Sequence, residues 1–140
     1  MIGTLMTRKA VRSAFISLNR GDIESFMKDW TEDAVFRYPT CVRVGGTIQG
    51  KPEIKRWFEG WVEQFPKREF VLNNLCVRDT FAFGGTNVIA AEWDVKLSNR
   101  DGRNFETSGV TVIEAINGKA VRVCDYIREP ELFREAWGEK

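Results

Sequence analysis

The chain has 140 residues and a net charge of +1, and 43% of its residues are apolar. This balance is typical of a globular domain with a substantial core, so residues 1–140 are expected to form a single domain. The near-neutral charge argues against a nucleic-acid partner, and no apolar run approaches the roughly 18 residues that span a membrane.

The chain lacks the residues and motifs that usually bind metals and cofactors. It has no histidine, and its three cysteines, Cys41, Cys76 and Cys124, form no CxxC pair. Neither the GxGxxG nor the GxxxxGK[ST] phosphate-binding motif is present. We therefore expect no metal and no organic cofactor. The widely spaced cysteines, and an N-terminus (Met1–Thr7) too short and polar for a signal peptide, predict a cytoplasmic protein.

The first half of the chain predicts three helices. An apolar period of 3.6 residues ends at Gly21, and Asp22 then caps a second helix. The predicted order is a helix over 7–19, a helix over 22–30, a strand over 34–38, a glycine-containing loop over 44–50, and a third helix from Pro52 to Phe65.

The second half reads as four strands, near residues 68–79, 86–97, 105–116 and 119–128, and a short helix from Pro130. Helices followed by an antiparallel sheet indicate an α+β fold. We predict a cone-shaped barrel, in which a strongly curved antiparallel sheet packs against three N-terminal helices, with a short C-terminal helix.

The dipeptide Asn117-Gly118 predicts a two-residue turn between the last two strands. Counting back from this turn places Val112 opposite Val123, and paired residues share a face of the sheet. The expected interior face holds Ser108, Val110, Val112, Val123, Asp125 and Ile127. The expected outer face holds Gly109, Thr111, Ile113, Arg122, Cys124 and Tyr126. The apolar part of that outer face predicts a homodimer.

Asp125 is the one acidic residue on the expected interior face. A carboxylate among valines and isoleucine would be desolvated, which raises its pKa and suits a general acid or base. The alternative is an Asp125 that is salt-bridged or lies at a wet rim.

Alternation in the strand near residues 86–97 separates an apolar set from a polar set that includes Glu92 and Asp94. The polar set indicates either a solvent-exposed face or the lining of a polar cavity. Four tryptophans are candidates for the core or for a ligand cage: Trp30, Trp57, Trp61 and Trp93.

Three segments carry a resemblance to a known family. They are WTEDAVFRYP at residues 30–39, GKP at residues 50–52 and NGKAVRVCDY at residues 117–126. Together with the order of helices and strands, they resemble the SnoaL-like branch of the nuclear transport factor 2-like superfamily over nearly the whole chain. The resemblance implies a cone that binds a small, mostly apolar molecule, usually in a dimer. It does not single out an activity, because members include cyclases, isomerases, dehydratases and epoxide hydrolases.

Most catalytic residues of these relatives have no counterpart here. Tyr38 stands where ketosteroid isomerases have their aspartate base, and Phe15 stands where they have an oxyanion-binding tyrosine. Residues 108–112 contain no second acid, and the histidine of the SnoaL cyclases and scytalone dehydratase is absent.

Resemblance to limonene epoxide hydrolase implies a pair of catalytic aspartates, Asp94 and Asp125, at the same sequence separation. Glu92 stands where that enzyme has an arginine. Two close carboxylates without this cation would share a proton. Arg37 could supply the charge if it, rather than Tyr38, faces the interior.

Three functions remain open from the sequence. The first is a cofactor-free isomerase, lyase, cyclase or epoxide hydrolase that acts on a small apolar molecule through Asp125 and Asp94. The others are a non-catalytic small-molecule binding protein and a dimeric interaction domain. The expected ligand-pocket residues are Phe15, Trp30, Tyr38, Trp57, Trp61, Glu92, Ser108, Val110, Val112, Val123 and Ile127.

Overall fold

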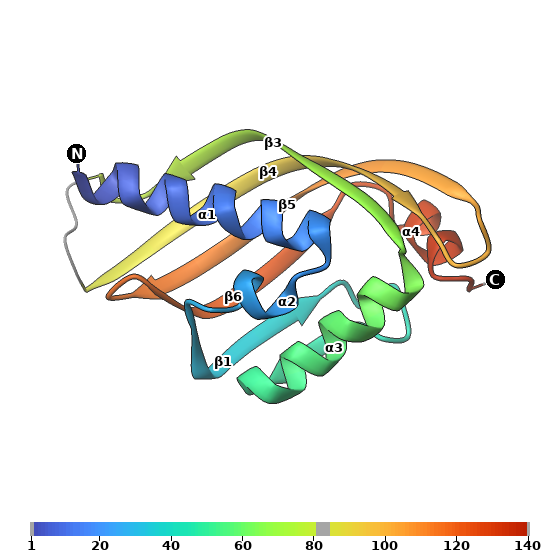
Figure 1. Cartoon of the computed structure of the whole chain (residues 1–140), viewed down its shortest axis with the longest axis horizontal. Helices are drawn as coiled ribbons and strands as arrows, with labels where there is room; N and C mark the ends of the chain where they lie inside the picture. The colour runs from blue at the N-terminus through green and yellow to red at the C-terminus, as the bar shows by residue number, and fades with distance from the viewer. Residues whose placement is uncertain (1, 81–84, 140) are drawn as a thin grey trace.

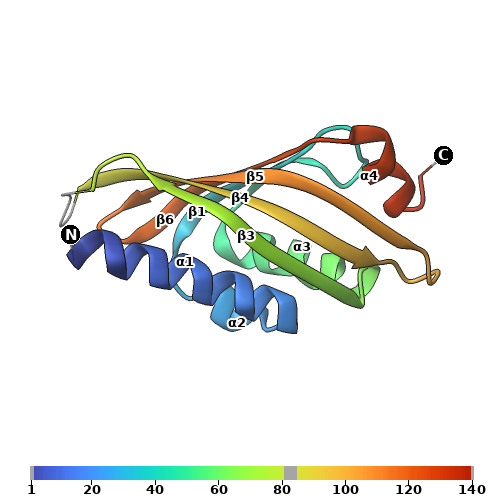
Figure 2. The ribbon, with the colours of Figure 1, turned by 90° about the horizontal axis from the view of Figure 1, so that it is seen from above.

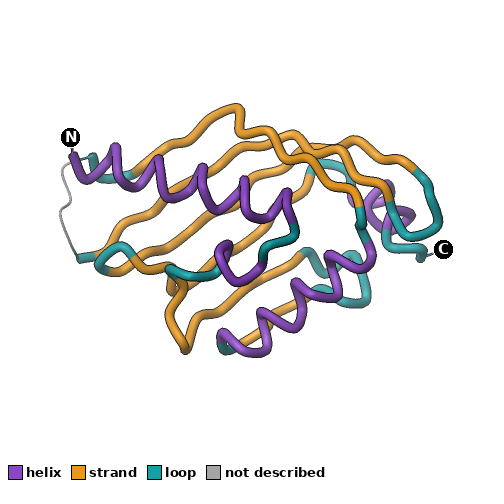
Figure 3. Tube along the Cα trace, viewed as in Figure 1, coloured by secondary structure: helices purple, strands orange, loops and turns teal. Residues whose placement is uncertain are grey.

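A computed structural model describes residues 2–80 and 85–139 of the chain. Within these residues the helices are α1 (Ile2–Arg20), α2 (Ile23–Phe26), α3 (Lys51–Gln64) and α4 (Pro130–Ala136). The strands are β1 (Trp30–Tyr38), β2 (Gly46–Gln49), β3 (Lys67–Val77), β4 (Thr86–Ser98), β5 (Asn104–Ile116) and β6 (Lys119–Ile127). The predicted α+β class is confirmed (Figure 3).

The strands form one curved sheet in the order β2-β1-β6-β5-β4-β3. All neighbours are antiparallel except β1 and β6, which run parallel. Helices α1, α2 and α3 lie along one side of the sheet, and α4 lies at the end remote from the start of α1 (Figures 1 and 2). The curved sheet against three helices is as predicted. Because β2 and β3 are edge strands, the sheet that forms this cone is open and not closed on itself.

Two elements in the first half differ from the prediction. Helix α2 ends at Phe26, and Trp30 begins β1 instead of ending the helix. The predicted loop near residues 44–50 contains β2, which pairs with Val35–Tyr38 of β1. The residues spaced as GxxxxGK from Gly45 to Lys51 do not form the loop of a phosphate-binding motif, because Gly46–Gln49 are the strand β2. Lys51 Nζ donates a hydrogen bond to the Trp30 carbonyl oxygen (3.2 Å).

The register of β5 and β6 departs from the prediction by one residue. The turn residue Asn117 has φ +50°, and Ala115 pairs with Ala120 as expected for a simple hairpin. Glu114 then pairs with Arg122, so Val121 is an extra residue in β6. A slip of one residue moves the rest of β5 to the other face of the sheet.

This bulge overturns several predicted orientations. Val112 pairs with Cys124, so Val112 and Val123 lie on opposite faces, contrary to the prediction. The predicted interior residues Ser108, Val110 and Val112 lie on the outer face. Thr111 and Ile113, predicted to lie outside, face the interior opposite Asp125 and Val123.

The alternation in β4 is confirmed, and its polar set belongs to the outer face. Every inward residue of the apolar set is nearly inaccessible, including Trp93 at 3% exposure. Asp94 is exposed, and half-buried Glu92 accepts a hydrogen bond from Asn74 Nδ2 (2.7 Å). Neither acid lines a polar cavity.

An aromatic cluster fills the end of the molecule near α4. The Tyr38 and Trp57 ring centroids lie 4.3 Å apart, and Trp61 is 4% exposed. The buried side chains of Gln64 and Asn99 donate hydrogen bonds to the Ala136 carbonyl oxygen, which anchors α4 against this cluster. Trp61 is therefore a core residue, half-buried Trp57 packs against the core, and neither of them lines the cavity.

Candidate functional site

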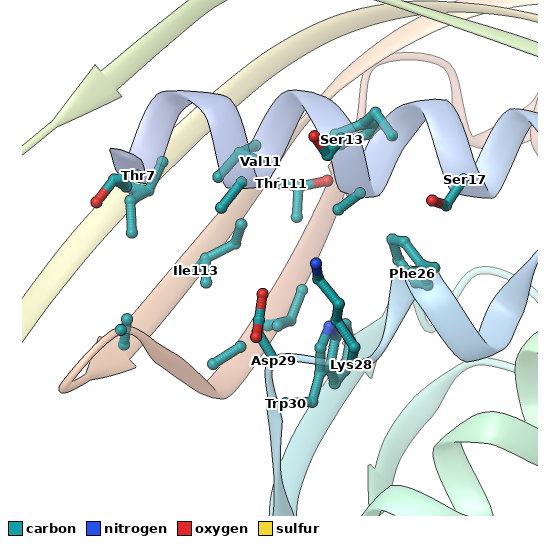
Figure 4. Close-up of a pocket in the computed structure, with 18 of the residues that line it drawn as sticks. Thr7, Val11, Ser13, Ser17, Phe26, Lys28, Asp29, Trp30, Thr111 and Ile113 are labelled. Carbon is teal, nitrogen blue, oxygen red and sulfur yellow. The ribbon is translucent and has the colours of Figure 1, made fainter. Parts of the chain in front are cut away.

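A cavity of about 440 Å³ lies between α1, the segment from α2 to β1, and the inner face of the sheet (Figure 4). This volume is within the usual range for small-molecule sites. Three predicted pocket residues line it, Phe15, Trp30 and Val123, and so does the predicted catalytic residue Asp125. Four others pack in or against the core outside its lining: Tyr38, Trp57, Trp61 and Ile127.

Aromatic rings form much of the cavity wall. The rings come from α1, α2, α3, β1 and β3: Phe15, Phe26, Trp30, Phe36, Phe58 and Phe70. They pack against one another, and the Phe36 and Phe58 centroids lie 4.9 Å apart. Because each ring is held by its neighbours, this wall is formed before any ligand arrives.

Asp125 belongs to a short hydrogen-bonded chain from the inner face of β4. Trp93 Nε1 lies 2.9 Å from Thr111 Oγ1, which lies 2.6 Å from Asp125 Oδ1. An indole N–H can only donate, so the Thr111 hydroxyl accepts from Trp93 and donates its single hydrogen to Asp125. Oδ1 is thereby occupied as an acceptor. No described residue bonds to Oδ2, which leaves that oxygen to exchange a proton with a ligand.

Gly109 leaves space for the Trp93 side chain, the first member of this hydrogen-bonded series. A Cβ at this position would lie 2.6 Å from Trp93 Cη2 and 2.3 Å from the Tyr126 carbonyl oxygen. Gly109 pairs with Trp93 across β4 and β5. The missing side chain therefore lets the indole pack closely against β5, with its N–H bonded to Thr111.

Desolvation dominates the electrostatics of Asp125. Burial raises the pKa of this carboxyl to about 6, and the hydrogen bond from Thr111 opposes that rise. No salt bridge within the described chain involves Asp125, which argues against the salt-bridged alternative. A carboxyl with this pKa can both accept and return a proton near neutral pH.

The expected partners of Asp125 lie elsewhere. Asp94 is on the outer face of the sheet, which contradicts its predicted place beside Asp125. Strand parity in β1 leaves Arg37 exposed and buries Tyr38. Burial raises the pKa of Tyr38 far above its usual value, and its hydroxyl accepts a hydrogen bond from Trp137 Nε1 (3.1 Å).

Sequence reasoning missed Thr111, the residue that orients Asp125. It was assigned to the outer face because nothing in the sequence marks Val121 as a bulge residue. It also missed the polar residues at the cavity edge, among them Ser13, Ser17 and Lys28. Among the described residues, no helix could cross a membrane and no group of three potential metal ligands occurs.

Comparison with known proteins agrees with this architecture. The profile of the SnoaL-like domain family matches residues 11–123. The uncharacterized protein YesE of Bacillus subtilis (strain 168) is 28% identical over 124 residues, covering 84% of this chain and 77% of YesE.

Two solved structures show the same fold at low identity. A Bacillus subtilis chain named as a candidate isomerase superposes with a TM-score of 0.81 at 23% identity, covering 98% of this chain and 96% of that one. A nuclear transport factor 2-like superfamily protein from Salmonella enterica superposes with a TM-score of 0.77 at 16% identity. The match covers 91% of this chain and 92% of that one. The chain therefore belongs to the SnoaL-like domain family and has the nuclear transport factor 2-like fold.

Proposed function

We propose that this protein binds a small, mostly apolar molecule in the cavity and catalyses proton transfer on it through Asp125. The observation that carries the proposal is a carboxyl on an aromatic-walled cavity, with one oxygen held by Thr111 and the other without a partner among the described residues. A ligand bound against the rings would meet an oriented base.

This arrangement fits isomerase or lyase chemistry best. Ionised Asp125 would take a proton from a C–H beside a carbonyl group and return it to another atom of the same molecule, so the enzyme would end in its starting state. Epoxide hydrolysis of the type suggested by the aspartate pair is disfavoured, since Asp94 lies on the outer face. A positioned acid–base group contributes about 10²–10⁴-fold to rate.

Exchange of carbon-bound hydrogen provides a direct test. A panel of small cyclic ketones and enones is incubated with the protein in deuterated buffer, and deuterium incorporation is followed by NMR. Asp125→Asn should reduce exchange about 10²-fold or more and leave ligand binding intact. Asp94→Asn, on the opposite face, is the control and should exchange like the wild type.

Unchanged exchange in Asp125→Asn would remove the catalytic proposal. The alternative, a non-catalytic binding protein with the same cavity, would then stand. A purely dimeric interaction domain is the weaker alternative, because it does not account for an aromatic-walled cavity of about 440 Å³.

The proposed functional unit is a homodimer in the cytoplasm. Its outer sheet face has no described helix over it (Figure 2), and it exposes Tyr126 beside half-buried Val110, Val112 and Cys124. This corrects the apolar stripe expected from the sequence, since Thr111 and Ile113 face inward. The free thiols at all three cysteines suit a reducing compartment.

A further inference from the structure

The cavity has an apolar interior and a polar mouth. In the interior, Phe36 and Phe58 are 1% and 5% exposed. The mouth, defined here as Ser13, Ser17, Lys28 and Asp29, is mostly solvent-exposed. Figure 4 shows Lys28 reaching from the segment before β1 toward α1, the helix that carries both serines. A ligand in the cavity would therefore have one polar end.

The backbone around Lys28 is held in place. Lys28 N donates to the Ser25 carbonyl oxygen (3.4 Å), and Trp30 N donates to that of Met27 (3.1 Å). Ala120 N, from β6, donates to the Asp29 carbonyl oxygen (2.8 Å). These bonds tie the segment to α2 on one side and to the sheet on the other, so the backbone of Lys28 is held beside the cavity.

Lys28 has no partner among residues 2–80 and 85–139, whereas the neighbouring lysines do. Lys51 bonds to the Trp30 carbonyl oxygen, and Lys55 forms an ion pair with Glu24 at 2.7 Å. An ammonium group that lines a cavity without a partner is available for a charge-assisted bond with a bound anion.

The segment that carries the mouth residues, residues 2–29, has an excess of positive charge. Over residues 2–29, five cations stand against three carboxylates, which gives +2 in a chain whose total is +1. The cations are Arg8, Lys9, Arg12, Arg20 and Lys28, and α1 contributes no acid. Of these charged residues only Lys28 and Asp29 line the cavity, so the other four cations act on an approaching anion only through the long-range field.

We propose that the ligand of this cavity is a mostly apolar molecule with one carboxylate, and that Lys28 binds the carboxylate at the mouth. The inference rests on the proposed function, because it assigns an orientation within the same cavity. With the anion at Lys28, the apolar body lies among the aromatic rings, on the side where Asp125 lines the wall.

Two fluorescent probes with one ring system test this inference. 1-Anilinonaphthalene-8-sulfonate carries an anion, and N-phenyl-1-naphthylamine is the same scaffold without it. Lys28→Gln should weaken binding of the sulfonate about fivefold to tenfold and leave the neutral amine within about twofold. Raising the ionic strength should weaken sulfonate binding to the wild type more than to the variant.

Two control variants locate the effect. Arg12→Gln removes an α1 cation that does not line the cavity, and it should change sulfonate affinity less than Lys28→Gln does. Ala14→Phe fills the cavity from α1 and should prevent binding of both probes.

The outcomes separate the two proposals. If both probes bind and Lys28→Gln changes neither affinity, the carboxylate assignment is wrong and the cavity proposal stands. If neither probe binds, or if Ala14→Phe leaves binding unchanged, the cavity proposal is wrong and the inference is lost with it.

Discussion

Asp125 links the cavity chemistry to the stability of the folded chain. Its pKa is raised from 3.8 to about 6 in the folded state, so between these values the native protein binds more protons than the unfolded chain. Stability from this residue is therefore greatest below about pH 4 and decreases as pH rises through about 6. The loss is on the order of 2–3 kcal/mol.

We predict that Asp125→Asn removes this part of the pH dependence. At pH 7.5 the variant should unfold at a higher urea concentration than the wild type, because it no longer buries a charge. At pH 4 the two proteins should unfold at similar urea concentrations, because the wild-type side chain is then neutral. Urea titrations at both pH values measure the difference; a constant gap between the two proteins would contradict a raised pKa.

Thr111 should also influence the pKa of Asp125, in the direction opposite to burial. Its hydrogen bond lowers the pKa of Asp125, so Thr111→Val should move the carboxyl titration above its wild-type midpoint near 6. Thr111→Ser keeps the hydroxyl and should titrate like the wild type. A ¹³C NMR pH titration of labelled aspartate carboxyls gives the midpoints. An unchanged midpoint in Thr111→Val would show that burial alone sets the pKa.

At the scale of elements, Gly109 is the position where the site depends most on a missing side chain. A Cβ there would collide with the Tyr126 carbonyl oxygen and the Trp93 ring. Gly109→Ala should lower the free energy of unfolding by about 2 kcal/mol or more, within the range for overpacked sites.

Gly60 is a matched control within α3. An added Cβ at Gly60 meets no atom within 4 Å, so Gly60→Ala should stabilise the protein by about 0.5–1 kcal/mol through helix propensity. Urea unfolding of both variants makes the comparison. Equal effects of the two substitutions would show that β5 can shift away from Trp93 at little cost.

Local patterns in the sequence were sufficient to predict most elements. The apolar periods, Asp22 and the Asn117-Gly118 turn predicted α1, the start of α2 and the hairpin. Alternation correctly assigned Trp93 and Asp94 to opposite faces of β4, but it left open whether the polar set faced solvent or a cavity. Asp125 kept its interior place because Val123 and Asp125 lie on one strand beyond the bulge.

The wrong predictions concerned features that depend on how strands and helices meet in the folded chain. The bulge at Val121 exchanges the inward-facing and outward-facing residues of β5, and no local sequence pattern marks it. Thr111 was therefore missed, and Val110 and Val112 were wrongly predicted to face the interior. The cavity wall was also incomplete, because Phe26, Phe36, Phe58 and Phe70 come from four different elements that meet only in the folded chain.

At the scale of the whole molecule, the two sides of the sheet have different surroundings. Helices α1, α2 and α3 lie on the cavity side (Figure 2), whereas the outer face is left to solvent among the described residues. On that face acids such as Glu114 lie beside bases such as Arg122, 3.4 Å apart. A twofold partner would present the same mixed surface, and acids and bases could pair across the axis.

We therefore predict a homodimer, and that Val112→Lys on β5 makes it monomeric. A stable interface buries about 800 Å² per partner, roughly a tenth of the 8224 Å² accessible surface of this chain. An unpaired ammonium at the centre of such an interface would cost several kcal/mol. Ile16→Lys, at a 51% exposed position on α1, is the control and should stay dimeric. Light scattering at micromolar concentration gives the mass of each protein; a wild-type mass near 16.1 kDa would contradict the dimer, and unchanged dimers of Val112→Lys would place the interface elsewhere.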